Sequence, residues 1–327
     1  MVSTIIITHN RLDLLKRAIT SVLSQTYKDI ECIVVDNNST DGTRDYCEKL
    51  DGIRYIHHIP TIGNGCNQAR NMAIRLARGE WCAFLDDDDR WFPTKIEEQL
   101  AVAKRKDCNI VYCRIRKEDI DLDGRHSFMN CPPNPNLQGD MSRKCLFSHI
   151  ALTSTLLIKK SVLLENNLFD EHCQFWQERE LLIRLLQHNS IYAAEKELIL
   201  YRADKTDAAR QSNKLRAWER SVRYIYQKHA GLVQHLSLYE RGLMKKNLVG
   251  DALSRTNPKS LYHRLLLCQR KLLKVYLVTL QPLERFSNGI EQFRVKITSG
   301  IMRWLTGKIG FSLASDRQNA SVEDLPL

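Results

Sequence analysis

Short apolar runs alternate with segments of helical periodicity over the first 95 residues of the chain. Runs rich in Ile, Val and Leu predict strands buried on both faces of a sheet: 3–8, 30–35, 53–56 and 81–85. The segments between them predict helices, the third over 63–78 and closed by Gly79. We therefore expect an α/β, Rossmann-like fold with a mostly parallel sheet flanked by helices.

The pattern changes after residue 95. Residues 107–150 are less regular and predict a mobile loop. Later elements are expected as a strand, a helix start, a helix and a strand over 151–158, 161–164, 175–187 and 191–201. From about 208 to 310 the periodicity is mostly helical. We predict a catalytic domain over 1–205, with halves 1–95 and 96–205, and a mostly helical C-terminal region over 206–327.

Composition indicates a globular protein, with 43% hydrophobic and 27% charged residues. The net charge of +11 is uneven, because residues 1–205 carry 28 basic and 29 acidic side chains, whereas 206–327 carry 21 and 9. None of the ten cysteines forms a Cys-x-x-Cys pair. With no signal peptide recognised, free thiols favour a cytoplasmic location. No stretch approaches the roughly 18 apolar residues of a membrane-spanning helix.

Polar residues follow the predicted strands, where parallel sheets bind their ligands. These candidates are Thr8, Asn10 and Arg11 after the first strand, Asp36 after the second, and Asp86, Asp87, Asp88 and Asp89 after the fourth. Asn10 is also expected to cap the following helix.

Four adjacent carboxylates repel one another and need a counter-charge. Mg²⁺ or Mn²⁺ fits, because these cations bind carboxylates together with substrate phosphates. Side-chain alternation at a strand end could direct Asp86 and Asp88 to the same side. A solvated acidic turn paired with Arg90 stays open as the alternative.

Three further residues have both a functional and a structural interpretation. Asp36 suits a ring N–H or sugar hydroxyl, since Ser39 and Asp41 are better placed to cap the next helix. Arg70 suits a diphosphate, although an arginine is ordinarily a surface residue. Glu178 suits a general base, although a carboxylate in the first turn of a helix is favoured by the helix dipole alone.

Several segments together resemble glycosyltransferase family 2, which has the GT-A fold. They are Ser3–Arg11, Cys32–Thr43, Gln68–Asn71, Gly79–Trp91 and Asn167–Glu171, continued by Phe175–Leu185 and Tyr201-Arg202. The resemblance covers roughly residues 1–205, and it implies that 1–95 form the nucleotide-sugar half and 96–205 the acceptor half, with the loop of 107–150 on the acceptor side. It implies a single displacement that inverts the anomeric carbon.

The resemblance also implies residue roles. Thr8, Asn10 and Arg11 line the nucleotide pocket, Asp36 holds the uracil or ribose of a UDP-sugar, and Arg70 approaches the base or phosphates. Asp86 to Asp88 match the Asp-x-Asp motif, which places Asp86 and Asp87 at the nucleotide and makes Asp88, with Asp86, the metal ligand for Mn²⁺ or Mg²⁺. Glu178 occupies the position of the catalytic base.

The sequence departs from the family pattern at three places. Glu178 stands where an Asp is usual, and its longer side chain shifts the carboxylate. The turn after the second strand reads Asp-Asn-Asn where a second Asp is common. A His that often follows Tyr201-Arg202 is absent. A sugar-binding relative without catalysis therefore stays open.

The basic C-terminal region predicts an anionic partner. In 261–283 and 301–313 apolar residues are interrupted by basic ones, and Trp304 and Phe311 lie close to Arg303 and Lys308. We expect this region to dock on the inner face of the plasma membrane. A helical subdomain packed on the catalytic domain is the alternative.

The predicted function is transfer of a sugar from a nucleotide diphosphate donor, a UDP-sugar, to a saccharide acceptor on a lipid diphosphate. Its expected context is bacterial surface polysaccharide: O-antigen, capsule or lipooligosaccharide. A nucleotidyltransferase is one alternative, but His9–Leu12 stands where its Gly-rich phosphate loop would be. A nucleic-acid-binding protein is the other, yet the aromatics of the tail form no stacking platform, so no nucleic-acid partner is expected.

Overall fold

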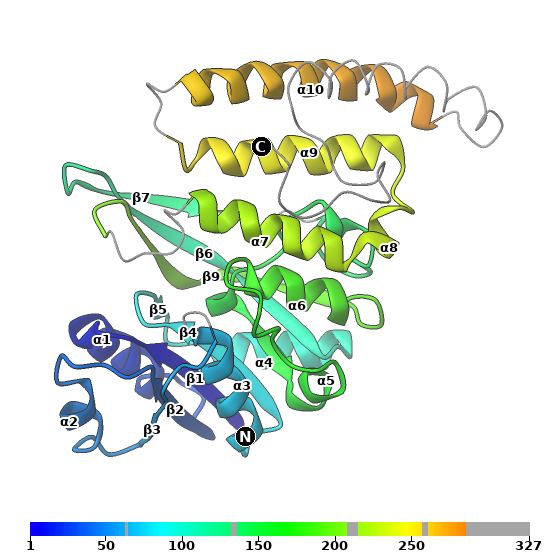
Figure 1. Cartoon of the computed structure of the whole chain (residues 1–327). Coiled ribbons are helices and arrows are strands. Elements are labelled where there is room, and N and C mark those ends of the chain that lie inside the picture. The colour runs from blue at the N-terminus through cyan, green and yellow to red at the C-terminus, as the bar shows by residue number, and fades with distance from the viewer. Residues whose placement is uncertain (63–64, 132–135, 208–214, 257–260, 286–327) are drawn as a thin grey trace. The chain divides into compact units, whose positions relative to one another are not determined.

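The computed structural model describes residues 1–62, 65–131, 136–207, 215–256 and 261–285 (Figure 1). The chain divides into two compact units, Met1–Val233 and Gln234–Leu327. The first unit therefore continues beyond residue 205, where the catalytic domain was predicted to end.

Four parallel strands form one side of the sheet in the first unit. They are β1 (Val2–Thr8), β2 (Ile30–Asp36), β3 (Ile53–His57) and β4 (Trp81–Asp86). Their order is β3-β2-β1-β4, and β1 pairs with both β2 and β4. All seven residues of β1 are buried, because helices cover both faces of a parallel sheet. The four predicted strands are confirmed.

Short helices connect these strands: α1 (Leu12–Leu23), α2 (Thr43–Cys47) and α3 (Cys66–Leu76). Leu15, Ile19 and Val22 of α1 are at most 1% exposed, as their helical spacing predicts. The carboxyl ends of β1, β2 and β4 reach the same edge, since Thr8 pairs with Asp36 and Ile7 with Asp86.

Two predicted helix ends were wrong. Asn10 does not cap α1, because its Oδ1 accepts from Thr40 N at 2.7 Å, and Leu12 N donates instead to Asp41 Oδ2 at 2.8 Å. Gly79 does not close α3, which ends at Leu76. A Cβ on Gly79 would lie 2.5 Å from Ser3 N, so glycine is required there for close approach to β1.

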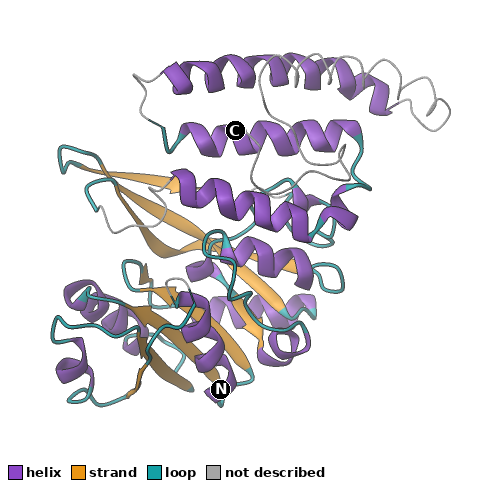
Figure 2. Ribbon diagram, viewed as in Figure 1, coloured by secondary structure: helices purple, strands orange, loops and turns teal. Residues whose placement is uncertain are grey.

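The sheet continues past β4 with mixed directions (Figure 2). The added strands are β5 (Arg90–Trp91), β6 (Ile110–Ile120), β7 (His126–Cys131), β8 (Leu157–Lys159) and β9 (Ile191–Asp204). The order is β4-β8-β6-β9-β5, with β7 paired to β6. β8 is antiparallel to β4 and β6, whereas β6 and β9 are parallel.

The predicted loop over 107–150 was therefore wrong over much of its length. β6 and β7 form a hairpin there, with Ile115 opposite Cys131 and Ile120 opposite His126. The charged segment Arg114–Asp119 obscured the apolar alternation that would have revealed the strand. The predicted strand over 151–158 was also too long, because Thr153–Thr155 form a 3-10 helix before β8.

The remaining helices of the first unit are α4 (Lys95–Lys106), α5 (Lys160–Glu165), α6 (Gln177–Leu185), α7 (Leu215–Lys228) and α8 (Ala230–Val233), with a second 3-10 turn at Lys144–Leu146. In the second unit, α9 (Leu238–Leu253) begins with a capping box of Ser237 and Glu240. Tyr276, Leu277 and Leu280 of α10 (Leu261–Arg285) pack against residues of α9. The tail segment 301–313, with Arg303, Trp304, Lys308 and Phe311, lies outside the described residues.

Candidate active site

A tight turn follows β4 and carries the four aspartates. Asp89 N donates to Asp86 O at 3.0 Å, which closes the turn. The strand ends at Asp86, so the alternation of side chains along a strand does not determine the direction of the Asp88 side chain, contrary to the prediction from the sequence. Asp86 has the most exposed side chain, at 41%, whereas Asp87 and Asp88 are 8% and 9% exposed. The turn thus offers one open carboxylate and a second beside it.

Among the described residues, Arg11 and Arg70 form ion pairs with this turn. Arg11 Nη1 lies 3.2 Å from Asp87 Oδ1 and 3.5 Å from Asp88 Oδ2, and its Nη2 lies 2.7 Å from Asp207 Oδ2. Arg70 Nη2 lies 2.9 Å from Asp86 Oδ1. Arg70 is 5% exposed, so it is not an ordinary surface arginine. These residues, rather than Arg90, pair with the acidic turn.

Asp87 and Asp89 are directed into the protein. Asp87 Oδ2 accepts from Thr8 Oγ1 at 2.8 Å. Asp89 accepts from Ser154 Oγ at 2.6 Å and from Arg202 N at 3.0 Å. Burial, reinforced by the charge of Asp88, raises the pKa of Asp87 to about 7 and that of Asp89 well above its usual range. These two carboxyls hold the turn against β1, the 3-10 helix and β9.

Asp36 and Asn10 lie at the neighbouring strand ends. Asp36 is fully buried, and its two oxygens accept from Ser39 N and from Tyr55 Oη, each at 2.9 Å. Asn10 has a φ of 53° and binds the 39–40 turn through Ser39 and Thr40. Both residues shape the edge from which Arg11 reaches the acidic turn.

Glu178 lies in the first turn of α6, is 7% exposed, and is oriented by residues distant in the sequence. Thr153 Oγ1 donates to its Oε2 at 3.3 Å, and His149 Nε2 lies 3.6 Å from its Oε1. Burial raises the pKa of Glu178 to about 6. The charges of Asp86 and Arg70 also act on this carboxyl, so it belongs to the same electrostatic environment as the acidic turn.

The backbone before Glu178 is strained. Trp176 has a φ of 56°, a left-handed conformation that is rare for a large side chain. Its ring packs edge-on to Trp218 of α7, with centroids 5.6 Å apart, and lies under the guanidinium of Arg179 at 4.5 Å. Such strain persists only where surrounding contacts hold it, and it concentrates at functional sites.

Sequence reasoning missed His149, Thr153, Ser154 and Trp176. His149 comes from the segment predicted as a loop, and Thr153 and Ser154 come from residues predicted as a strand that form a 3-10 helix instead. The fourth carries a backbone conformation that its residue type does not suggest. Only the tertiary fold brings these residues to the predicted carboxylates.

The acidic turn fits a cation that is held partly by substrate. Among the described residues, no group of three or more His, Cys, Asp or Glu side chains is arranged to bind a metal. Mg²⁺ and Mn²⁺, however, often bind through one or two carboxylates and complete their shell with phosphate oxygens and water. Asp86 and Asp88 supply hard oxygen ligands of that kind.

Comparisons with known proteins agree with the fold and the motif order. The sequence profile of Glycosyl transferase family 2 matches residues 3–166, about half of the 327 residues. An uncharacterized glycosyltransferase of Rickettsia typhi is 33% identical over 205 residues, which is 61% of this chain and 63% of that protein.

A second relative is the Escherichia coli protein WfaP, named UDP-Glc:alpha-D-GlcNAc-diphosphoundecaprenol beta-1,3-glucosyltransferase. It is 36% identical over 163 residues, 50% of this chain and 62% of that protein. The match spans less than two thirds of each of these two relatives. Among solved structures, S. aureus TarS 1–349 in complex with UDP-GlcNAc has a TM-score of 0.58 at 17% identity, covering 81% of this chain and 78% of that one. The predicted GT-A fold class is confirmed.

Proposed function

The chain belongs to glycosyl transferase family 2, and from this premise we propose that it transfers a sugar from a UDP-sugar to a glycan acceptor with inversion. The observation that carries the proposal is that the first unit contains two carboxylate sites in different environments. One is the acidic turn with Arg11 and Arg70, and the other is Glu178, whose pKa is raised to about 6. The first suits a diphosphate and the second suits a proton.

In this mechanism Arg70 and Arg11 bind the donor diphosphate beside Asp86 and Asp88. Mn²⁺ or Mg²⁺, held by Asp86 and Asp88, would supply charge that stabilises the leaving diphosphate. Glu178 takes the proton from the acceptor hydroxyl as its oxygen bonds to the anomeric carbon. The bond from that carbon to the diphosphate oxygen breaks, and UDP carries away the electron pair.

Thr8, Asn10 and Asp36 form the edge where the nucleoside would lie, with Asp87 supporting it from inside. Each oxygen of Asp36 accepts one hydrogen bond within the protein, from Ser39 N or from Tyr55 Oη, and has a second lone pair with which it could accept from the uridine. Thr8, through its bond to Asp87, would maintain the position of the acidic turn.

The donor and acceptor classes rest on the relatives. UDP-GlcNAc is bound in the TarS structure, and the name of WfaP specifies UDP-Glc and an acceptor on diphosphoundecaprenol. A Bacillus subtilis relative, 37% identical over 110 residues, is named a putative teichuronic acid biosynthesis glycosyltransferase. These names support a UDP-sugar donor, a lipid-linked acceptor and a role in bacterial surface polysaccharide assembly. They favour transfer over the nucleotidyltransferase and nucleic-acid-binding alternatives.

A lipid-linked acceptor would require the enzyme to work at a membrane surface. In the part of the chain that the structure describes, no helix is long and apolar enough to span a bilayer. The outer face of α10 instead mixes exposed apolar and basic side chains: Leu267, Lys271, Lys274, Val275 and Val278. Val275 and Val278 are 66% and 68% exposed. We propose that this face docks on anionic lipid on the cytoplasmic side.

Flotation with vesicles containing anionic lipid tests the docking. Lys271→Gln with Lys274→Gln should weaken binding by roughly tenfold or more, because each basic residue contributes about 1 kcal/mol at an anionic surface. Lys104→Gln with Arg105→Gln on α4 is the matched control and should bind like the unchanged protein. Equal binding by both double variants would remove α10 from the proposal.

Release of UDP from a panel of nucleotide sugars, with Mn²⁺, Mg²⁺ or EDTA, tests the proposed reaction. We expect slow, cation-dependent release from one UDP-sugar. Calorimetry of UDP binding accompanies it, because hydrolysis without an acceptor is slow in transferases. Absence of both release and cation-dependent UDP binding would overturn the proposed function.

A further inference from the structure

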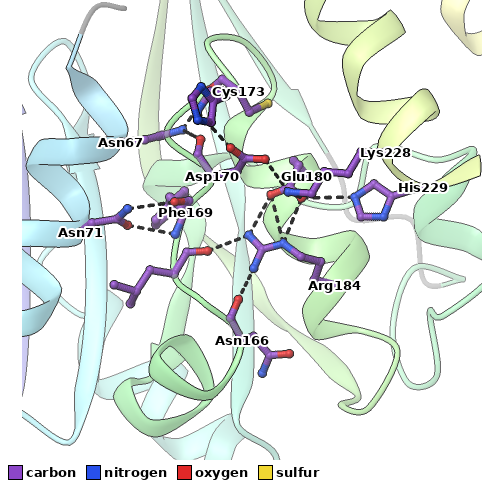
Figure 3. A network of polar contacts seen from close by, with 12 residues as sticks. Asn67, Asn71, Asn166, Phe169, Asp170, Cys173, Glu180, Arg184, Lys228 and His229 are labelled. Atoms are coloured by element: carbon purple, nitrogen blue, oxygen red, sulfur yellow. Dashed lines mark hydrogen bonds and ion pairs between the residues drawn. The ribbon is translucent and has the colours of Figure 1, made fainter. Parts of the chain in front are cut away.

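A short turn at Asp170–Cys173 leads into the strained segment before Glu178. Cys173 N donates to Asp170 O at 3.1 Å, and His172 N donates to Asp170 Oδ1 at 2.9 Å. Figure 3 shows the polar contacts that surround this turn. They reach it from two helices that are far apart in the sequence, α3 and α7.

Asn67 holds the turn from the side of α3. It is 4% exposed, and its Nδ2 donates to Asp170 O at 2.6 Å and to Cys173 O at 2.9 Å. Its Oδ1 accepts from Arg70 Nη1 at 3.1 Å. One helical turn later, Asn71 exchanges two hydrogen bonds with the backbone of Phe169, at 2.8 and 2.9 Å. The side-chain amide of Asn67 therefore links Arg70, which pairs with the acidic turn, to the segment before Glu178.

Lys228 holds the turn from the side of α7. Its ammonium forms ion pairs with Asp170 and, at 2.8 Å, with Glu180 of α6. Tyr224 Oη donates to Asp170 Oδ2 at 2.7 Å. Burial alone would raise the pKa of Glu180, but hydrogen bonds from His229 and Arg184 outweigh it and hold that pKa at about 2. Lys228 thus bridges the turn to the helix that carries Glu178.

We propose that these contacts form a clamp, defined as Asn67, Asp170, Glu180 and Lys228, that positions the Glu178 carboxylate relative to Arg70. Lys228 is the positioning residue at its outer end. The inference rests on the proposed function, because it assigns to the clamp the alignment of the base with the donor site.

Two physical considerations make such a clamp necessary. The left-handed backbone of Trp176 is strained and needs fixed surroundings. A misplacement of about 1 Å between reacting groups can lower a rate about a hundredfold. Glu178 contacts Thr153 only at 3.3 Å and His149 at 3.6 Å, so the backbone of 170–178 has a large share in setting its position.

Lys228→Met tests the clamp in the full-length protein. It removes the bridge, while Asp170 keeps Tyr224 and Glu180 keeps Arg184 and His229. We expect kcat per folded molecule to fall about 10- to 100-fold. UDP affinity should stay within about twofold, and amide hydrogen exchange should rise in peptides covering 169–180. Lys228→Arg should restore most of kcat, since a guanidinium can bridge two carboxylates.

Lys196→Met is the matched control, because Lys196 also pairs with a glutamate, Glu98, but away from the clamp. It should leave kcat and exchange over 169–180 unchanged. The clamp is overturned if Lys228→Met transfers at the unchanged rate, or if kcat and UDP affinity fall together. If the unchanged protein neither binds UDP nor transfers sugar, the proposed function fails. Equal transfer rates in the unchanged protein and in Lys228→Met would instead overturn only the clamp.

Discussion

The two halves of the first unit both withdraw carboxylates from water, but they stabilise them in opposite ways. At the edge of β1–β4, the guanidinium groups of Arg11 and Arg70 lie 2.9–3.5 Å from Asp86, Asp87 and Asp88. In α6, Glu178 has a hydroxyl at 3.3 Å and an imidazole at 3.6 Å, and its pKa rises to about 6. The first half pairs the carboxylates of Asp86 and Asp88 with arginines, whereas the second keeps one carboxylate ready to take a proton.

This difference corresponds to two kinds of chemistry. In a cluster of aspartates and arginines, a diphosphate can replace the aspartates as the partner of the arginines, because both are anions. A divalent cation can likewise replace the arginines as the partner of the aspartates. A buried carboxyl with a raised pKa is a better base near neutral pH than an exposed one. Substitutions in the two halves should therefore change different measured quantities.

The largest effect is expected for Glu178→Gln, which keeps the shape of the side chain but cannot accept the proton. Transfer should fall by about 10²–10⁴, the usual contribution of a general base. UDP binding should be unchanged in calorimetry. A rate within about threefold of the unchanged protein would assign the base to another residue.

A somewhat smaller effect is expected for Asp88→Asn, at about 10²–10³ in transfer, as for the loss of one group that stabilises developing charge. The apparent affinity for Mn²⁺ should fall with it, as measured by titration of activity. Arg90→Gln, which removes a charge beside the turn, is the control and should leave the affinity for Mn²⁺ unchanged, because the turn forms its ion pairs with Arg11 and Arg70. Equal cation affinity in Asp88→Asn would contradict the predicted ligand role.

The pH dependence of kcat/KM should reveal the state of Glu178, because this parameter reports the pKa values of the free enzyme. Its folded pKa is about 6, so the active carboxylate form is lost as the pH falls through that value. We expect the rate to fall at acid pH with a midpoint near 6. The residual rate of Glu178→Gln should lack this fall. A midpoint near 4.5, the ordinary value for glutamate, would show that burial does not tune this group.

The smallest effect concerns stability and Asp89. Folding raises its pKa, so its contribution to stability is greatest at low pH and is lost as the pH rises through the folded pKa. Asp89→Asn should therefore increase the free energy of unfolding at pH 8, by about 1.4 kcal/mol for each unit of the raised pKa that is removed. At pH 5 the gain should shrink. Equal gains in urea unfolding at both pH values would exclude titration of Asp89 as the cause.

The two halves also differ in how far the sequence predicts them. β1, β2 and β4 are continuous apolar runs followed at once by the site residues, so local pattern is enough to place Asp86 and Asp88. β6 is interrupted by charges, and the partners of Glu178 come from the 149–154 segment and from α7 through Trp176. Those contacts join residues far apart in the sequence, and no local periodicity encodes them.

The domain boundary shows the same limit. Composition changes near residue 205, yet Lys228 and Tyr224 of α7 bind Asp170 within the first unit. A charge sum records which residues are basic but not which of them are paired inside the fold. Lys228 was counted among the basic residues of the C-terminal region 206–327, although it belongs to the first unit.

Calorimetric binding of UDP with Mn²⁺ and with EDTA, measured side by side on Asp88→Asn and Glu178→Gln, tests the central division between the halves most directly. We predict that Asp88→Asn loses the Mn²⁺-dependent part of UDP binding, whereas Glu178→Gln retains it and loses only transfer. The account would be contradicted if Asp88→Asn bound UDP with unchanged dependence on Mn²⁺, or if Glu178→Gln lost UDP binding as well.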